Sequence, residues 1–467
     1  MKKRILIGTA EIARGTYNLS IGFRELGHNV DSLVYGKSRF YDDVEYTFSE
    51  VDFLNEVTYT TNEQGQVIPQ VSKKFYSFIE PYDIFVFTAG TSLLPRMVDL
   101  PILKRMGKTI ISRHCGTEVR DYELAKIFWT DYGRFYPYYQ KDIETPKISC
   151  SSENDLLAYS RYHPALANKM HNARMSERYA DVILSGPPSH TLGLRPYFQS
   201  GPSIDTRHID CKIPGRQVPI ILHAPSSSVY KQTDTILQAL QELKDEGVRF
   251  QLELLQEVPN QIVCQAITEA DIVIDELSCG SGLLAFEAMA GGCAVLGGHD
   301  GISSPLPRNR PVLNINANNF KEVVKTVVQD VGLRTQLARM GRDYIDSKFS
   351  SPTSIASYIL ESLEREKKLD RDLYPTLFTE RATIPDGEPM PSYLQHRTLE
   401  IMQLYGVHPQ TDLQRLVDNN LLPSLNKNEI DSIPRWEVST LQQEGPWILT
   451  SPNAQHGSAV PVPVVGC

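Results

Sequence analysis

Short apolar runs of strand length alternate with helical segments along the first 366 residues. The runs are expected to be strands, at residues 5–8, 30–35, 82–88, 109–112, 180–184, 218–223, 249–255, 271–275, 294–297 and 312–315. Helical segments between them include residues 16–26, 233–245, 260–269, 283–290 and 319–329. Such alternation is typical of βαβ units, in which helices cover a parallel sheet. The sequence therefore predicts an α/β fold.

The alternation is interrupted at residues 201–217, which are rich in glycine, proline and charged residues and have no sustained periodicity. Such a segment is typical of a linker. We therefore expect two Rossmann-like, doubly wound domains, at residues 1–200 and 218–335, that face each other across a cleft. Residues 336–368 are strongly helical with a break near 350–352. Residues 369–467 are rich in proline and predict a partly disordered C-terminal extension.

Composition excludes some classes of protein. The net charge of −9 over 467 residues argues against a nucleic-acid partner, since such proteins usually carry a basic patch. The seven cysteines are scattered without a C-x-x-C pair, which favours reduced thiols and a cytoplasmic location. No apolar run has the length of a signal peptide or of a membrane span. A peripheral membrane contact stays open, and the oligomeric state is not predicted.

A glycine-rich turn joins the strand expected at 271–275 to the helix expected at 283–290. It contains Gly280, Ser281 and Gly282, and Leu283 begins the helix. Glycines let the backbone approach a ligand closely, and a helix N-terminus favours a phosphate. Glu287 lies one turn further on, where a carboxylate suits sugar hydroxyls. The alternative is a plain strand–turn–helix with a solvated or capping glutamate.

The same region resembles a known family. Residues 285–298 read AFEAMAGGCAVLGG, which is similar to the E-A-M-A-x-G-x-P-V-I signature of the retaining family 4 (group 1) nucleotide-sugar glycosyltransferases. Residues 223–234 resemble the family's loop ending in K-G-x-D, and residues 113–120 resemble its H-G-[ST]-[DE]-x-R turn with Cys115 inserted. The linker and the helices at 336–368, which return to the first domain in the family, are also similar. The resemblance covers residues 1–366.

The resemblance implies a GT-B fold and transfer of a sugar from a nucleoside-diphosphate sugar to a carbohydrate, lipid-linked or small-molecule acceptor. By the same resemblance Lys231 binds the donor diphosphate, Glu287 the donor ribose and His114 the donor sugar, and these three are the catalytic candidates. Further donor-side candidates are Gly280, Ser281, Gly282, Leu283, His223, Ser226 and Glu276. Acceptor-side candidates are Gly8, Arg14, Gly15, Gly116, Thr117, Glu118 and Arg120. No cofactor is expected, and no metal, because no D-x-D motif follows an expected strand.

Several candidates have a plain structural alternative. Lys231 could be a solvated loop lysine, and His114 a neutral histidine bonded to a loop carbonyl. Glu118 and Arg120 could form a surface ion pair, which contributes about 0–1 kcal/mol.

Three departures from the family pattern keep other functions open. Cys279 stands where the family has a second glutamate, the arginine partner of Lys231 is missing from residues 226–230, and the loop at 8–15 is not a G-G-x-x-x-x-G loop. One alternative is a binding or scaffold protein on a decayed transferase fold, which would not bind nucleotide. Another is a GT-B sugar-nucleotide epimerase, which would convert the donor without an acceptor. A dinucleotide oxidoreductase is disfavoured, because no G-x-G-x-x-G follows the first strand.

Overall fold

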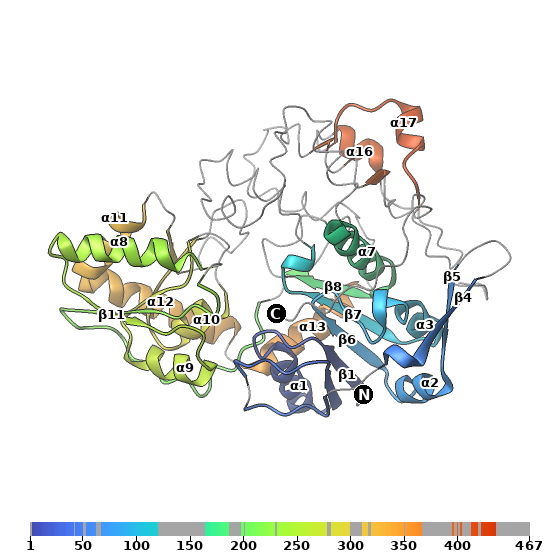
Figure 1. Cartoon of the computed structure of the whole chain (residues 1–467), viewed down its shortest axis with the longest axis horizontal. Coiled ribbons are helices and arrows are strands. Elements are labelled where there is room, and N and C mark those ends of the chain that lie inside the picture. The colour runs from blue at the N-terminus through green and yellow to red at the C-terminus, as the bar shows by residue number, and fades with distance from the viewer. Residues whose placement is uncertain are drawn as a thin grey trace. The chain divides into compact units, whose positions relative to one another are not determined.

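The structure is a computed structural model of the chain (Figure 1). It describes residues 2–41, 43–49, 53–61, 67–119, 164–185, 198–199, 201–228, 231–277, 282–298, 311–315, 319–349, 351–366, 395–396, 399, 402–403, 412–418 and 422–435. The chain divides into two compact units. The first comprises Met1–Asp52 and Glu80–Glu388, and the second Phe53–Ile79 and Pro389–Cys467.

The first unit begins with a parallel sheet in the order β3-β2-β1-β6-β7-β8-β9. Its strands are β1 (Arg4–Thr9), β2 (Asn29–Val34), β3 (Phe48–Ser49), β6 (Ile84–Thr88), β7 (Thr109–His114), β8 (Val182–Ser185) and β9 (Phe198–Gln199). The helices α1 (Gly15–Glu25), α3 (Leu100–Arg105) and α7 (Pro164–Tyr179) connect them. The central strands are apolar on both faces, and Ile5 pairs with both Val30 and Ile84. Such strands suit a sheet covered on both sides.

The second sheet is also parallel, in the order β11-β10-β12-β13-β14. Its strands are β10 (Ile220–His223), β11 (Gln251–Leu254), β12 (Ile272–Ile274), β13 (Ala294–Gly297) and β14 (Val312–Asn314). One hydrophobic core lies under α8 (Thr233–Asp245) and α11 (Phe320–Gln329). The other lies under α9 (Asn260–Glu269) and α10 (Leu283–Ala290), and α12 (Val331–Lys348) contributes to both. The sheet is therefore doubly wound.

The chain returns to the first sheet at its last long helix. In α13 (Pro352–Glu366), Ile355 and Ile359 pack in the same buried cluster as Ile5 and Leu19 of the first sheet and α1. Gly22 makes this packing close, because a Cβ at that position would lie 2.3 Å from the carbonyl oxygen of Pro352. The first sheet is thus completed by a helix from far along the chain.

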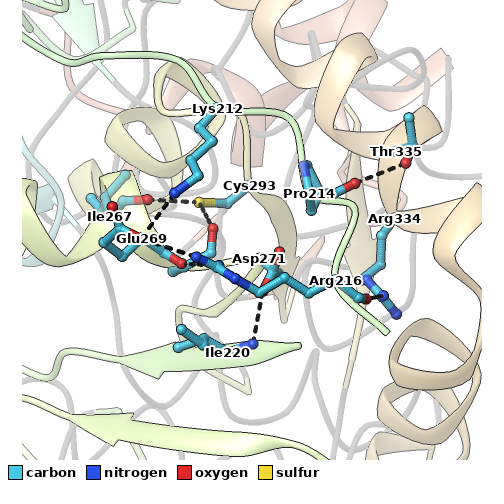
Figure 2. Close-up of polar contacts among 11 residues, drawn as sticks. Lys212, Pro214, Arg216, Ile220, Ile267, Glu269, Asp271, Cys293, Arg334 and Thr335 are labelled. Atoms are coloured by element: carbon cyan, nitrogen blue, oxygen red, sulfur yellow. Dashed lines mark hydrogen bonds and ion pairs between the residues drawn. The ribbon is translucent and has the colours of Figure 1, made fainter. Parts of the chain in front are cut away.

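The segment between the two sheets is held by polar contacts with residues of the second sheet domain (Figure 2). The guanidinium of Arg334, which is completely buried in α12, donates to the carbonyls of Val327 (2.8 Å), Val328 (2.5 Å) and Arg216 (2.5 Å). The side chain of Arg216 in turn contacts Asp271 (3.1 Å), which precedes β12. Residues 201–219 contain no helix or strand, so side chains rather than a backbone ladder fix this segment.

The second compact unit contains the antiparallel pair β4 (Val57–Thr61) and β5 (Val67–Val71), with the single-turn helix η1 (Leu54–Glu56) before it. Phe53 packs edge-on against Phe75 of α2 (Lys73–Ile79), with 5.5 Å between ring centroids. The same unit includes the short helices α16 (Leu413–Asp418) and α17 (Lys427–Asp431). Asn426 and Glu429 form a capping box on α17, which satisfies two backbone N–H groups at its start.

The predicted fold class is confirmed, because the chain has two parallel, Rossmann-like α/β sheets in tandem, as in the GT-B fold. The narrower resemblance to family 4 and the domain boundaries stay predictions. Within the described part of the chain, none of the helices combines the length and apolar character that a membrane span requires.

Candidate active site

Lys231 lies at the carboxyl edge of the second sheet, against two carboxylates that follow β12. Its Nζ is 2.6 Å from Oδ1 of Asp275 and 3.4 Å from Oε2 of Glu276. The lysine side chain is 16% exposed and that of Asp275 is completely buried. Burial alone would lower the pKa of Lys231, but the charges of Asp275 and Glu276 outweigh it and raise the pKa. Lys231 is therefore a protonated, largely buried cation and not a solvated loop lysine.

The side chain of Asp275 also contacts the backbone at the N-terminus of α10. Its second oxygen, Oδ2, accepts the backbone N–H of Gly282 at 2.7 Å. Gly282 is the residue before the helix, and a Cβ there would lie 3.5 Å from Nζ of Lys231. One internal carboxylate thus bridges the two positive groups that the sequence assigned to a diphosphate. Leu283 begins the helix as expected, while Gly280 and Ser281 lie outside the described residues.

Glu287 is buried in α10 and is held by an amide. Its Oε1 and Oε2 accept from Nδ2 of Asn260, at 3.0 and 3.2 Å, and its residue is 7% exposed. Burial raises the pKa of Glu287 to about 7, although the Asn260 hydrogen bond and the charge of Arg14 act to lower it. The glutamate is neither solvated nor a cap of its own helix. Its carboxylate is instead poised between its two protonation states near neutral pH.

A loop that follows β2 lies against the start of α9, close to Glu287. The backbone N–H of Asn260 donates to the carbonyl of Phe40 at 3.0 Å. Asp43 in the same loop accepts from Nη2 of Arg14 at 2.5 Å and from Nε2 of Gln261 at 2.9 Å. Residues of both sheets therefore surround the buried carboxylate.

His223 uses both ring nitrogens for contacts within the second sheet domain. It ends β10 completely buried, with Nδ1 2.9 Å from the carbonyl of Ile274 and Nε2 3.0 Å from Oγ1 of Thr233. The carbonyl requires a proton on Nδ1, so Nε2 accepts from the threonine hydroxyl. Both nitrogens are used within the protein. His223 therefore positions the start of α8, and neighbouring Ser226 is exposed.

On the first sheet, His114 ends β7 and is 1% exposed. Its Nδ1 lies 3.7 Å from Oε1 of Glu118, a carboxylate that also accepts the backbone N–H groups of Cys115 and of Gly116, the latter at 2.9 Å. Burial would raise the pKa of Glu118, but His114 and these N–H groups outweigh it and lower the pKa. Glu118 thus closes its own turn. Arg120 and the side chain of Thr117 lie outside the described residues.

The first loop combines packing glycines with buried charge. Gly8 is needed for close packing, since a Cβ there would lie 2.3 Å from the carbonyl oxygen of Leu33. Gly15 opens α1, and a Cβ there would lie 2.8 Å from Nη1 of Arg113. Glu11 caps this helix through the N–H groups of Thr16 and Tyr17 at 3.3 and 3.2 Å.

Four residues of these clusters were not singled out from the sequence. Asp275 had a usable signal, since it is a carboxylate directly after a strand-like run in an α/β sheet. Asn260, Glu11 and Arg113 had none, because their roles depend on contacts between segments far apart in the chain. In the described part of the chain, no group of three or more His, Cys, Asp or Glu residues could hold a metal ion.

Comparison with known proteins shows similarity in backbone fold but not in sequence. No protein-family model matches the sequence. No curated protein is significantly similar to it. HepE of Anabaena, solved with UDP-glucose, is 11% identical, with a TM-score of 0.49 over 78% of this chain and 100% of its own. A TarM mutant of S. aureus, solved with UDP, is 10% identical, with a TM-score of 0.47 over 78% of this chain and 99% of its own.

An epimerase is similar to the same extent. The UDP-GlcNAc 2-epimerase of Neisseria meningitidis, solved with UDP-GlcNAc, is 12% identical, with a TM-score of 0.43 over 78% of this chain and 100% of its own. The fold assignment rests on the two sheets described above. The choice of function rests on the residues at their carboxyl edges.

Proposed function

We propose that this protein is a glycosyltransferase that moves a sugar, with retention, from a nucleoside-diphosphate sugar to an acceptor. One observation supports this proposal most directly: the buried ammonium of Lys231 and the N-terminus of α10 lie together, and Asp275 contacts both. A diphosphate needs this combination of a compact cation and free backbone N–H groups. Glu287 lies one turn further along the same helix, within reach of sugar hydroxyls.

Lys231 and the N-terminus of α10 would stabilise the leaving diphosphate. Negative charge builds up on that group as the bond from the sugar to phosphate oxygen breaks. Preorganised positive groups in a buried site lower the energy of such a transition state. The diphosphate would take over from Asp275, which holds both groups in this structure. No residue is assigned as a covalent nucleophile.

Glu287 would accept hydrogen bonds from the donor ribose. The ionised carboxylate would accept these hydrogen bonds, and Asn260 fixes its orientation. His114, held beside Glu118, would contact the transferred sugar from the first sheet. The acceptor-side candidates Gly116, Thr117, Arg120, Arg14 and Gly15 belong to the same proposal, as do the turn residues Gly280 and Ser281. The acceptor would be a carbohydrate or a lipid-linked molecule. The protein would act in the cytoplasm and would need no cofactor.

The test is nucleotide binding, measured as a shift in melting temperature with UDP, GDP, ADP and their sugars. A ligand at a hundredfold excess over its dissociation constant stabilises the native state by about 2.7 kcal/mol. We expect one nucleotide to stabilise the wild type and not Lys231→Ala. Lys321→Ala is the matched control, because Lys321 is an exposed lysine of the same sheet domain that pairs with Glu242 and Glu246. An equal shift in Lys231→Ala would refute the assignment of this site.

A second candidate, a binding protein without transferase activity, is favoured by the same carboxylate. Asp275 already satisfies Lys231 and Gly282, so the site is complete without a ligand. Such a protein would show no melting shift with any nucleotide. An epimerase would bind the donor and convert it in the absence of an acceptor, which product analysis of the donor alone detects.

A further inference from the structure

Arg113 is a buried guanidinium without a hydrogen bond. It lies in β7 and is 8% exposed. No hydrogen bond or ion pair links its side chain to any residue that the structure describes, and its Nε is buried without a partner. Buried charges in proteins are normally paired, since an unpaired buried charge is strongly unfavourable. Among the residues that the structure describes, no anion therefore pairs directly with Arg113.

The guanidinium is directed at the N-terminus of a helix. Nη1 would lie 2.8 Å from a Cβ on Gly15, the first residue of the eleven-residue helix α1. The absence of a side chain at Gly15 lets the cation reach the helix end. This end of a helix carries partial positive charge. A cation held against it is unfavourable until an anion lies between the two.

The carboxylate of Glu11 caps this helix end, but it makes no hydrogen bond or ion pair with Arg113. Glu11 interacts with Arg113 only at longer range, and its oxygens accept from Thr16, Tyr17 and the hydroxyl of Tyr46 at 2.7 Å. Burial raises the pKa of Glu11, although these hydrogen bonds and the charge of Arg113 act to lower it.

Arg14 immediately precedes Gly15 and adds a second donor. Its Nη2 pairs with Asp43, while its Nε is buried without a partner. Positive donors thus outnumber their acceptors at this helix end.

We propose that the guanidinium of Arg113, with Nε of Arg14, forms a binding site for the phosphate or carboxylate group of a small molecule. A guanidinium presents two parallel N–H groups that match both kinds of oxyanion. The site lies at the carboxyl edge of the first sheet, where ligands of such sheets bind. We assign this phosphate or carboxylate group to the acceptor, and that assignment rests on the proposed function. The existence of the site does not depend on it.

The experiment measures binding of inorganic phosphate and of acetate by calorimetry and by melting temperature. Arg113→Met removes the charge and keeps an unbranched side chain, and Arg249→Met is the control because Arg249 is exposed. We expect an oxyanion to bind the wild type, Arg249→Met and Lys231→Ala, and binding to be lost in Arg113→Met. Binding of phosphate alone, of acetate alone or of both supports the site and names its chemistry. Absence of binding to the wild type, or full binding to Arg113→Met, overturns it.

Two further measurements separate this site from a structural role and from the donor site. Without ligand, Arg113→Met is expected to melt at or above the temperature of the wild type, since an unpaired buried charge is replaced by an apolar group. A marked loss of stability would show a structural partner and overturn the proposal. Nucleotide binding should persist in Arg113→Met, so failure of the donor site and failure of the oxyanion site give different results.

Discussion

At the scale of single residues, the candidate site depends on two carboxylates in opposite situations. Asp275 is fully paired, with an ammonium on one oxygen and a backbone N–H on the other. Glu287 is buried, has one amide for both oxygens, and has no cation in direct contact among the described residues, although the charge of Arg14 acts on it. The difference decides what each substitution should do.

Replacing Asp275 should strengthen diphosphate binding. In Asp275→Asn the side-chain oxygen still accepts from Gly282, but the negative charge next to Lys231 is lost. A diphosphate then meets less repulsion, and we expect about a tenfold gain in affinity, the effect of 1.4 kcal/mol. Calorimetry with the nucleotide that binds the wild type measures it. Glu276→Gln is the control, because Glu276 lies further from Nζ of Lys231, at 3.4 Å, and its loss should give a smaller gain in affinity. Weaker nucleotide binding in Asp275→Asn would contradict the idea that the diphosphate displaces Asp275.

Glu287 should make the stability of the protein depend on pH. Its pKa in the folded state, about 7, is raised above the ordinary value of 4.5. The unfolded state then releases its proton first, so the free energy of unfolding falls as pH rises from 4.5 through 7. Glu287→Gln should abolish this part of the slope and be about 1–3 kcal/mol more stable than the wild type at pH 7.5. Urea unfolding of both proteins at several pH values measures it, and parallel curves would refute the raised pKa.

At the scale of helices and strands, amphipathic patterns predicted the second sheet closely. Helices α8, α9 and α10 have the predicted bounds. Helices α8 and α9 each have an apolar stripe, whereas α10 is apolar nearly all round and begins directly after Gly282. The pair β4 and β5 was not predicted, since Pro69 within β5 argues against a strand. Helix α3 is short and begins with Pro101 in its first turn, and α7 has few apolar positions. Their helical state depends on tertiary packing that a local pattern does not contain.

The contact between α1 and α13 offers a test at this scale. Gly22→Ala would place a Cβ 2.3 Å from the carbonyl of Pro352, so the helices must move apart. Overpacking of this kind costs about 1–3 kcal/mol or more. The control is Gly36→Ala, because no atom lies within 4 Å of a Cβ there. Thermal unfolding should show a lower melting temperature for Gly22→Ala alone, and equal values for the two variants would contradict the close packing.

At the scale of the molecule, the sequence predicted two sheets and a linker but not how the linker is held. Arg334 is a charged residue in a helical pattern, where a solvated position is the normal expectation. Its complete burial follows from three backbone carbonyls, one of them from Arg216 in the linker. The contacts of Asn260 with Phe40 and of Gly15 with Arg113 likewise join distant segments. Pattern and resemblance thus give the fold and the strand-end residues, whereas their charge partners require the three-dimensional structure.

Arg334→Met should destabilise the protein through the linker. The carbonyls of Val327, Val328 and Arg216 lose a charged donor, and we expect a loss of about 2–4 kcal/mol. Chemical unfolding measures this loss. Arg339→Met is the control, because Arg339 is exposed on the same helix. If both variants unfolded at the same denaturant concentration, the buried tether would have no role in stability.

The internal carboxylate at the donor site has a further consequence, which concerns selectivity. A ligand with one negative charge would replace Asp275 at Lys231 but not at Gly282. Its binding free energy would be small, because Asp275 must give up both of its contacts. A diphosphate brings two phosphate groups and offers one to the ammonium and one to the helix. Under the proposed function, Asp275 would therefore set a minimum ligand charge for occupation of the site. Abundant monoanions in a cell would leave such a protein empty, and a nucleoside diphosphate would fill it.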